Sequence, residues 1–230
     1  MNEFMQDSAI MGVVLSLLAY EIGAFIKKKT KLSLFNPLLI SIILVIVFLL
    51  IFDIDYESYN AGAKYISYLL TPATVSLAIP LYQQLHLLKK NLFAILIGIT
   101  SGVLTSLVSI LAMAMLFHLS HEEYITLLPK SITTAIGMGI SKELGGYVTI
   151  TVASIIVTGI LGNMIGAISC KLFRIKHPIA KGLAIGTSSH AIGTSKAMEL
   201  GEVEGAMSSL AIVVAGLLTV VLASVFAMFY

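Results

Sequence analysis

The sequence predicts an all-α polytopic membrane protein with about six full spans and two re-entrant broken-helix hairpins arranged as an inverted repeat. Its 230 residues are 58% hydrophobic and only 11% charged, with a mean hydropathy of +1.00, whereas soluble domains contain roughly a quarter charged residues. The apolar runs are long and continuous and lack the alternation of a transmembrane barrel, so the spans are expected to be helices. The positions of the basic residues then give the direction of each crossing.

The first four apolar stretches end alternately in basic and acidic segments. Lysines follow the first stretch at 27–31 and the third at 89–90, whereas acidic residues follow the second at 53–57 and the fourth at 122–123. The chain is expected to be a multi-pass protein of the cell membrane. Because basic loops are retained in the cytoplasm, its N-terminus is expected on the outer side. The third stretch contains Pro72 and Pro80 and is expected to be kinked or broken. The four stretches cover approximately residues 8–26, 34–52, 61–82 and 92–117.

Two later segments are predicted to be re-entrant. If residues 124–146 crossed the membrane fully, the basic loop 171–181 would lie outside, against the positive-inside rule. We therefore expect residues 124–146 to enter and leave on the outer side. Residues 182–201 should do the same on the inner side, with full spans at about 148–170 and 206–229.

The re-entrant segments match each other at an offset of 56 residues. Ile136-Gly137 corresponds to Ile192-Gly193, and Glu143-Leu144-Gly145 corresponds to Glu199-Leu200-Gly201. Each unit joins a hairpin to one full span, so successive copies point in opposite directions across the bilayer, as in secondary transporters. The chain 1–230 is thus expected to be a single transmembrane domain. It consists of a first helix pair (1–60), a fainter diverged unit (61–120), a broken-helix repeat unit (122–172) and an inverted broken-helix repeat unit (177–230).

Polar breaks in both hairpins predict a binding site. Pro129-Lys130-Ser131 interrupts the first hairpin, and Gly186-Thr187-Ser188-Ser189 interrupts the second. Hydroxyl and glycine residues suit the start of a half-helix, and two such N-termini would favour an anion such as a carboxylate. The alternative is that these residues serve only helix packing and local backbone bonding. The predicted substrate-binding residues are Thr71, Lys130, Ser131, Thr133, Thr134, Thr187, Ser188, Ser189, His190 and Gly193.

Ionisable groups at membrane depth suggest specific roles. Lys130 is expected to pair with a substrate carboxylate, and His190 to donate to it or to carry a coupled proton. Alternatively, Lys130 snorkels or pairs elsewhere, and a neutral His190 ties two helices together. Glu143 and Glu199 are candidates for holding an ion pair or for coupling protons, with interfacial solvation as the alternative. The sequence contains no metal-ligand or cofactor motif, no catalytic arrangement is assigned, and the net charge of +2 does not favour nucleic-acid binding.

Three stretches of the chain resemble the LrgB/CidB family of bacterial membrane proteins. These stretches are Leu70 to Tyr82, Leu128 to Ile136 together with Ile140 to Gly146, and His177 to Thr194. The resemblance implies either holin-like or antiholin-like proteins that affect murein hydrolase activity and lysis, or transporters of pyruvate, glycolate or glycerate. It also implies a small membrane partner of the LrgA/CidA type, and we expect a homo-oligomer.

Two functions therefore remain open. The first is a secondary transporter of small monocarboxylates that works by alternating access and is not an enzyme. The second is a holin-like or antiholin-like membrane protein. The matched helix breaks favour the transporter, because a simple pore needs no inverted pair of broken helices.

Overall fold

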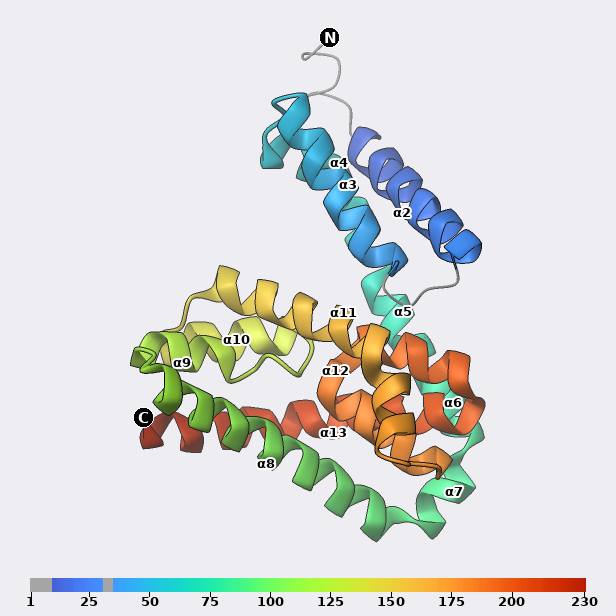
Figure 1. Cartoon of the computed structure of the whole chain (residues 1–230), viewed down its shortest axis with the longest axis vertical. Coiled ribbons are helices and arrows are strands. Elements are labelled where there is room, and N and C mark those ends of the chain that lie inside the picture. The colour runs from blue at the N-terminus through green and yellow to red at the C-terminus, as the bar shows by residue number, and fades with distance from the viewer. Residues whose placement is uncertain (1–9, 31–34) are drawn as a thin grey trace. The chain divides into compact units, whose positions relative to one another are not determined.

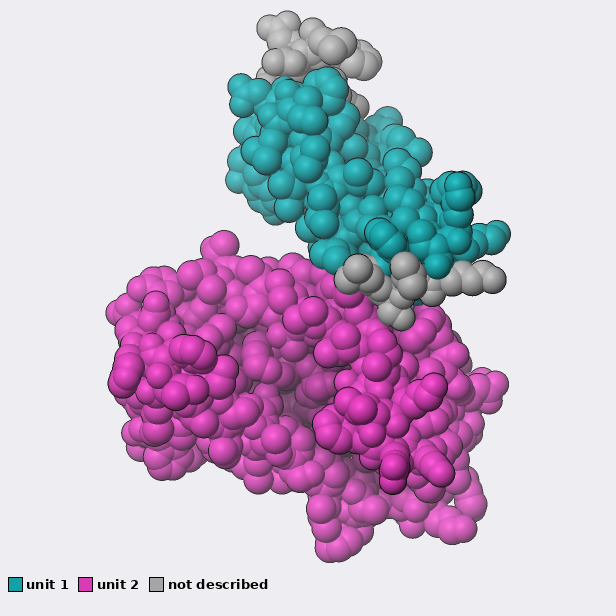
Figure 2. Space-filling model, viewed as in Figure 1, with its two compact units in different colours: residues 1–76 teal, residues 77–230 magenta. Residues whose placement is uncertain are grey.

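The computed structural model describes residues 10–30 and 35–230. Predictions that concern Ser8, Lys31 and Leu34 fall outside the described residues, as do the side chains of Leu70, Thr71 and Thr74. All regular secondary structure in the described ranges is helical, which confirms the predicted all-α class. The chain forms two compact units, residues 1–76 and 77–230 (Figure 2), and each is treated by itself below.

Unit 1 is a small helical assembly whose helices have well-defined caps. The side-chain oxygen of Asn36 accepts hydrogen bonds from the N–H groups of Leu38 (2.8 Å) and Leu39 (3.3 Å). The Asp55 carboxylate caps the next helix in the same way by accepting from the N–H of Ser58 at 2.9 Å. The helices of this unit are α2 (Met11–Thr30), α3 (Pro37–Ile51), α4 (Tyr56–Ser67) and α5 (Leu70–Ser76).

The third predicted stretch is broken into short helices, as its prolines suggested. It contains most of α4, all of α5 and most of α6 (Ala78–Gln83), and α7 (Leu85–Lys90) follows it. Pro72 and Pro80 each occupy the third position of their helix. Proline is tolerated there because the N–H groups of the first turn have no partner within the helix.

Unit 2 contains three long apolar helices: α8 (Leu92–Phe117), α11 (Val148–Leu172) and α13 (Glu202–Phe226), which η1 (Ala227–Phe229) extends. Among the described residues these are the three helices long and apolar enough to cross a membrane, and α3 is apolar but shorter. The bounds of α8 and α11 agree closely with the predicted spans. Helices α8 and α13 pack alongside each other (Figure 1), while large apolar side chains such as Phe93 and Leu217 point outward, as suits a lipid environment.

The first hairpin consists of α9 (His121–Leu127) and α10 (Thr134–Leu144), separated by a non-helical segment around Pro129. This segment is the break predicted from the sequence. Gly145 ends α10 in the left-handed conformation with φ 89°. The end of the hairpin lies beside its start. Tyr147 Oη donates to Glu122 at 2.7 Å, and the Tyr147 N–H donates to Thr126 Oγ1 at 2.8 Å.

The second hairpin is α12 (Pro178–Leu200), which contains a break at His190 with φ 42° and ψ −143°. The prediction that Gly186 to Ser189 would form the break is therefore wrong by one residue, because the break lies at His190, directly after Ser189. The hydroxyl of Thr187 donates to Leu183 O and that of Ser188 donates to Ala184 O, both at 2.8 Å. These bonds to the preceding turn let the hydroxyl residues remain helical, so they end the first half-helix instead of starting the second.

The second half of α12 folds back along the first. Gly193 lies directly against Ser189, which leaves no room for a larger residue. Gly201 ends α12 in an extended conformation (φ 163°), unlike the left-handed Gly145 at the matched position. Lys181 Nζ lies 3.6 Å from Glu204 Oε1, so the start of α13 is beside the start of α12.

The two hairpins begin at opposite ends of α13. Tyr124 Oη donates to Phe226 O at 3.0 Å, and Tyr230 Oη donates to Leu119 O at 2.7 Å. These bonds hold the start of α9 against the last turn of α13, whereas the Lys181–Glu204 ion pair lies at its first turn. The buried core of unit 2 runs between these ends and joins α8 to α13.

Candidate functional site

One large cavity in unit 2 is bordered by the first helix break and by the half-helix that ends just before the second break. The cavity has a volume of about 1070 Å³ and is lined by α8, α11, the first half of α12 and the break between α9 and α10. Figure 2 shows that the surface of this unit is hollowed. The structure thus brings together five of the predicted residues: Lys130, Ser131, Thr187, Ser188 and Ser189.

The wall formed by α8 was missed in the sequence. Its lining residues are small or polar and recur at spacings of three and four, so they form one face of the helix. A stripe of this kind inside an apolar helix is the signal that would have identified the wall. Gly102 illustrates the reason for the small size, because a Cβ there would lie 2.9 Å from Thr187 Oγ1. The stripe consists of Ala94, Gly98, Ser101, Gly102, Thr105, Ser106 and Ser109.

The wall formed by α11 combines apolar and small residues. Leu161 and Ile165 supply an apolar surface, and Thr158 adds a hydroxyl. Gly162 accommodates Ser189, since a Cβ at Gly162 would collide with the Ser189 side chain. The position of the Ser189 hydroxyl therefore depends on the absence of a side chain at Gly162.

The polar centre of the cavity consists of one cationic group and several hydroxyls. Lys130 Nζ donates to Ser131 Oγ at 3.1 Å, and Ser131 Oγ lies 3.1 Å from Ser106 Oγ. Ser188 Oγ and Ser189 Oγ lie 2.9 Å apart. Within the described ranges, no carboxylate lies within 4.0 Å of Lys130 Nζ. An ammonium group and hydroxyl donors beside apolar walls can bind a small anion with an apolar part.

The cavity reaches only one end of the unit. Its lining continues to Asn91 and His177, at the starts of α8 and α12, and to Phe173 at the end of α11. Described residues at the opposite end, such as Tyr147 and Phe226, are not part of the lining. Exposed basic residues lie near the Asn91 end at Lys171, Arg174 and Lys176.

Five predicted residues lie elsewhere or are not described. Thr133 precedes α10 without a side-chain capping bond, and neither it nor Thr134 lines the cavity. Gly193 is a packing residue, and the side chain of Thr71 in α5 lies outside the described part. The expected pair of half-helix N-termini therefore does not match the lining, which instead includes the last turn of the first half of α12.

His190 is buried beside the cavity and does not line it. Its Nε2 atom lies 2.9 Å from Ile155 O, and because a carbonyl oxygen only accepts, the ring donates from Nε2. The ring packs on Gly159, where a Cβ would lie 2.7 Å from the ring carbon Cε1. In this placement His190 joins α12 to α11, and its role in binding or proton coupling stays a prediction.

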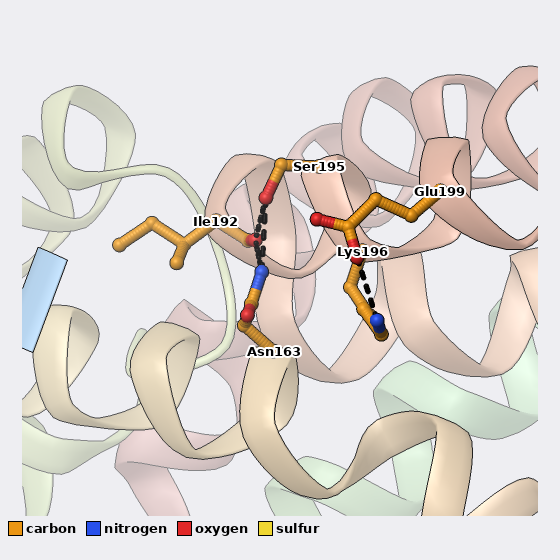
Figure 3. A network of polar contacts seen from close by, with 5 residues as sticks. All are labelled: Asn163, Ile192, Ser195, Lys196 and Glu199. Atoms are coloured by element: carbon orange, nitrogen blue, oxygen red, sulfur yellow. Dashed lines mark hydrogen bonds and ion pairs between the residues drawn. The ribbon is translucent and has the colours of Figure 1, made fainter. Parts of the chain in front are cut away.

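Figure 3 shows polar contacts of the second half of α12, and those made by Asn163 hold it to α11. Asn163 Nδ2 donates to Ile192 O and to Ser195 Oγ, both at 2.9 Å. Lys196 forms an ion pair with Glu199 at 2.6 Å. Glu143 and Glu199 are both exposed, so the structure leaves their coupling role a prediction. No group of three or more metal-binding side chains occurs in the described ranges.

Comparison with known proteins gives a consistent family match. The sequence matches the LrgB-like family over residues 16–229. It is 44% identical over 216 residues to a protein of Bacillus mycoides (strain KBAB4) named antiholin-like protein LrgB, with 94% of each chain covered. Proteins of the same name from Bacillus cereus (strain B4264) and Bacillus anthracis (strain CDC 684 / NRRL 3495) are 43% identical with the same coverage. No solved structure matches.

Proposed function

The chain belongs to the LrgB-like family, and from that premise and the geometry of its cavity we propose that it transports small monocarboxylates of the pyruvate, glycolate or glycerate type. The observation that carries the proposal is one cavity in which the first helix break, with the Lys130 ammonium, faces the half-helix that ends directly before the second break. Backbone breaks at membrane depth persist where they line a cavity, and in transporters such breaks form the substrate site.

Lys130 and Ser131 are the proposed carboxylate ligands. The Lys130 ammonium has the Ser131 hydroxyl as its neighbour and no carboxylate within ion-pair distance among the described residues. A substrate carboxylate would therefore provide the missing counter-charge in a site where solvent screening is reduced. Ser188 and Ser189 on the facing half-helix supply further hydroxyl donors.

The remaining walls suit the apolar part of a small carboxylate. Leu161, Ile165 and Leu183 line the cavity without polar atoms. With one cationic side chain at its polar centre, the site favours a monoanion over a dianion, whose second carboxylate would be left without a partner.

Alternating access is proposed to arise from two hairpins in an inverted repeat. The contacts Tyr147–Glu122 and Lys181–Glu204 support this arrangement, because each joins the start of a hairpin to the start of the long helix that follows it. We propose about six full spans in the cell membrane with the N-terminus outside. The cavity then opens toward the cytoplasm, since its Asn91 end carries the basic residues.

The proposal is tested with the purified full chain in liposomes, with and without a small LrgA/CidA-type partner. Saturable uptake of labelled pyruvate or glycolate is expected, and Ser131→Ala should reduce it at least tenfold. Ser224→Ala is the matched control, because Ser224 is exposed on α13 away from the cavity. Equal uptake by Ser131→Ala would reject the site, and the absence of saturable uptake of either labelled carboxylate would reject transport.

A second function is favoured by the names of the relatives. The similar proteins from three Bacillus species are named antiholin-like, so we also consider a role in modulating murein hydrolase activity and lysis, exerted through homo-oligomers or the small partner. Expression should then change the rate of autolysis in cells and release large dyes from vesicles without saturable uptake. Autolysis that changes only when carboxylate uptake is intact would make the lytic effect secondary to transport.

A further inference from the structure

A second, very small void lies behind the polar centre of the cavity. It has a volume of about 10 Å³, and α8, the first break, the first half of α12 and α13 all contribute to its lining. A volume of roughly 10–15 Å³ holds one water molecule if polar partners are present. The polar residues that line it are Ser106, Ser131, Thr187 and Thr219.

Thr219 on α13 has an unused hydroxyl at this void. The residue is only 4% exposed, and its hydroxyl makes no hydrogen bond to any other described residue. Described side chains include no fully enclosed polar atom that lacks a partner. The Thr219 oxygen must therefore retain free surface, and the void is the space that this residue lines.

The neighbouring hydroxyl groups present both a hydrogen-bond acceptor and hydrogen-bond donors to the void. Thr187 Oγ1 donates its proton to Leu183 O at 2.8 Å, so toward the void it can only accept. Ser106 and Ser131 have two hydroxyl protons, but only one can lie in the 3.1 Å contact between their oxygens. The proton of Thr219 thus needs an acceptor in the void, and one proton of the Ser106–Ser131 pair is free to point either to the void or to the large cavity, which both serines also line.

We propose that the void binds one ordered water molecule, which accepts from Thr219 and from the Ser106–Ser131 pair and donates to Thr187. Water is the ligand that matches two donors and an acceptor at once. A cation does not fit, because it would leave the hydroxyl protons without acceptors and would lie close to the Lys130 ammonium, which is bonded to Ser131. The water connects α13 to the first helix break and to the first half of α12, whether or not the protein transports a carboxylate.

The test compares the wild type with Thr219→Val and Thr219→Ser. Valine keeps the branched shape of threonine but has no hydroxyl, whereas serine keeps the hydroxyl. A density map of the full chain that resolves water should contain a peak about 2.7–3.2 Å from Thr219 Oγ1. The peak should persist in Thr219→Ser and disappear in Thr219→Val. Thermal unfolding in detergent should show a lower midpoint for Thr219→Val by about 2–4 °C, with Ser224→Ala unchanged.

Two results would overturn the proposal. The first is a dry void, seen as no peak in the wild-type map together with a Thr219→Val midpoint equal to that of the wild type. The second is a midpoint that rises with sodium chloride relative to choline chloride at equal ionic strength in the wild type but not in Thr219→Val, which would identify a sodium site. Neither result depends on uptake, so failure of this proposal is distinguishable from failure of the proposed transport.

Discussion

Ile155 O accepts a hydrogen bond from His190 Nε2 at 2.9 Å, and the side chain of the same isoleucine fills the space beside Gly137. His190 forms the break of the second hairpin, and Gly137 lies in the first hairpin just after its break. One residue of α11 therefore contacts both hairpins. A shift of α11 would displace its contacts with both hairpins at the same time, which gives a physical route for coupling between the two breaks.

We predict that His190→Gly is more stable than His190→Ala by about 1 kcal/mol. Both substitutions remove the ring and its bond to Ile155 O, but φ 42° with ψ −143° is a conformation that glycine adopts readily and alanine does not. Thermal unfolding in detergent measures the difference. At Lys142, an exposed helical position, the order should reverse, with alanine more stable than glycine. The same order at both sites would show that the His190 backbone is not strained.

Gly162→Ala should abolish carboxylate uptake and destabilise the protein by about 1–3 kcal/mol. The added methyl would occupy the position of the Ser189 side chain, which must then leave the cavity wall. Gly139→Ala is the matched control, because nothing lies within 4 Å of a Cβ at Gly139. That variant should be as stable as the wild type or slightly more stable. Uptake by Gly162→Ala at the wild-type rate would separate Ser189 from the transport site.

Replacement of Lys130 by methionine should raise the KM for a monocarboxylate about tenfold or more, which corresponds to at least 1.4 kcal/mol of lost binding. Methionine keeps the length and the apolar stem but removes the ammonium group, whereas Lys130→Arg keeps the charge and should retain most of the uptake. Initial rates over a range of substrate concentrations give the KM. Lys142→Met removes an exposed charge outside the cavity lining and should leave the KM unchanged. An unchanged KM in Lys130→Met would exclude Lys130 as a carboxylate ligand.

Single cysteines should report opposite sides of the membrane for the two hairpins. In a Cys170→Ala background, cysteines at His121 and Glu143 should react with a membrane-impermeant maleimide from one side, and those at Lys176 and Glu202 from the other. All four positions are exposed, and each pair brackets one hairpin. Labelling of His121→Cys and Glu143→Cys from different sides would mean that the first hairpin crosses fully, which contradicts the re-entrant arrangement.

Much of the helical framework could be predicted because it depends on composition. Continuous apolar runs of sufficient length gave the bounds of α8 and α11, and Pro129 marked the first break, since proline disrupts helical bonding in any context. That Lys130 and Thr187 line the same cavity could be predicted from the sequence repeat and from the free-energy cost of unpaired backbone groups at membrane depth.

The details of the site depend on contacts that no local pattern specifies. Because Thr187 and Ser188 bond back to their own helix, the second break lies at His190, one residue beyond the hydroxyl segment. In the sequence, Ser106 cannot be distinguished from any other small residue of an apolar helix. Its place in the site depends on the packing of α8 against the first break. The role of Thr219 likewise becomes visible only when four elements enclose the same void.

The size of the large cavity has a consequence for selectivity. At about 1070 Å³ it holds on the order of tens of water molecules, far more than a carboxylate of three carbons displaces. A ligand in this conformation stays largely hydrated, and water can stand between the apolar walls and its carbon chain. If the chain transports small carboxylates as proposed, discrimination between them requires a narrower conformation, in which the walls expel this water and close around the ligand.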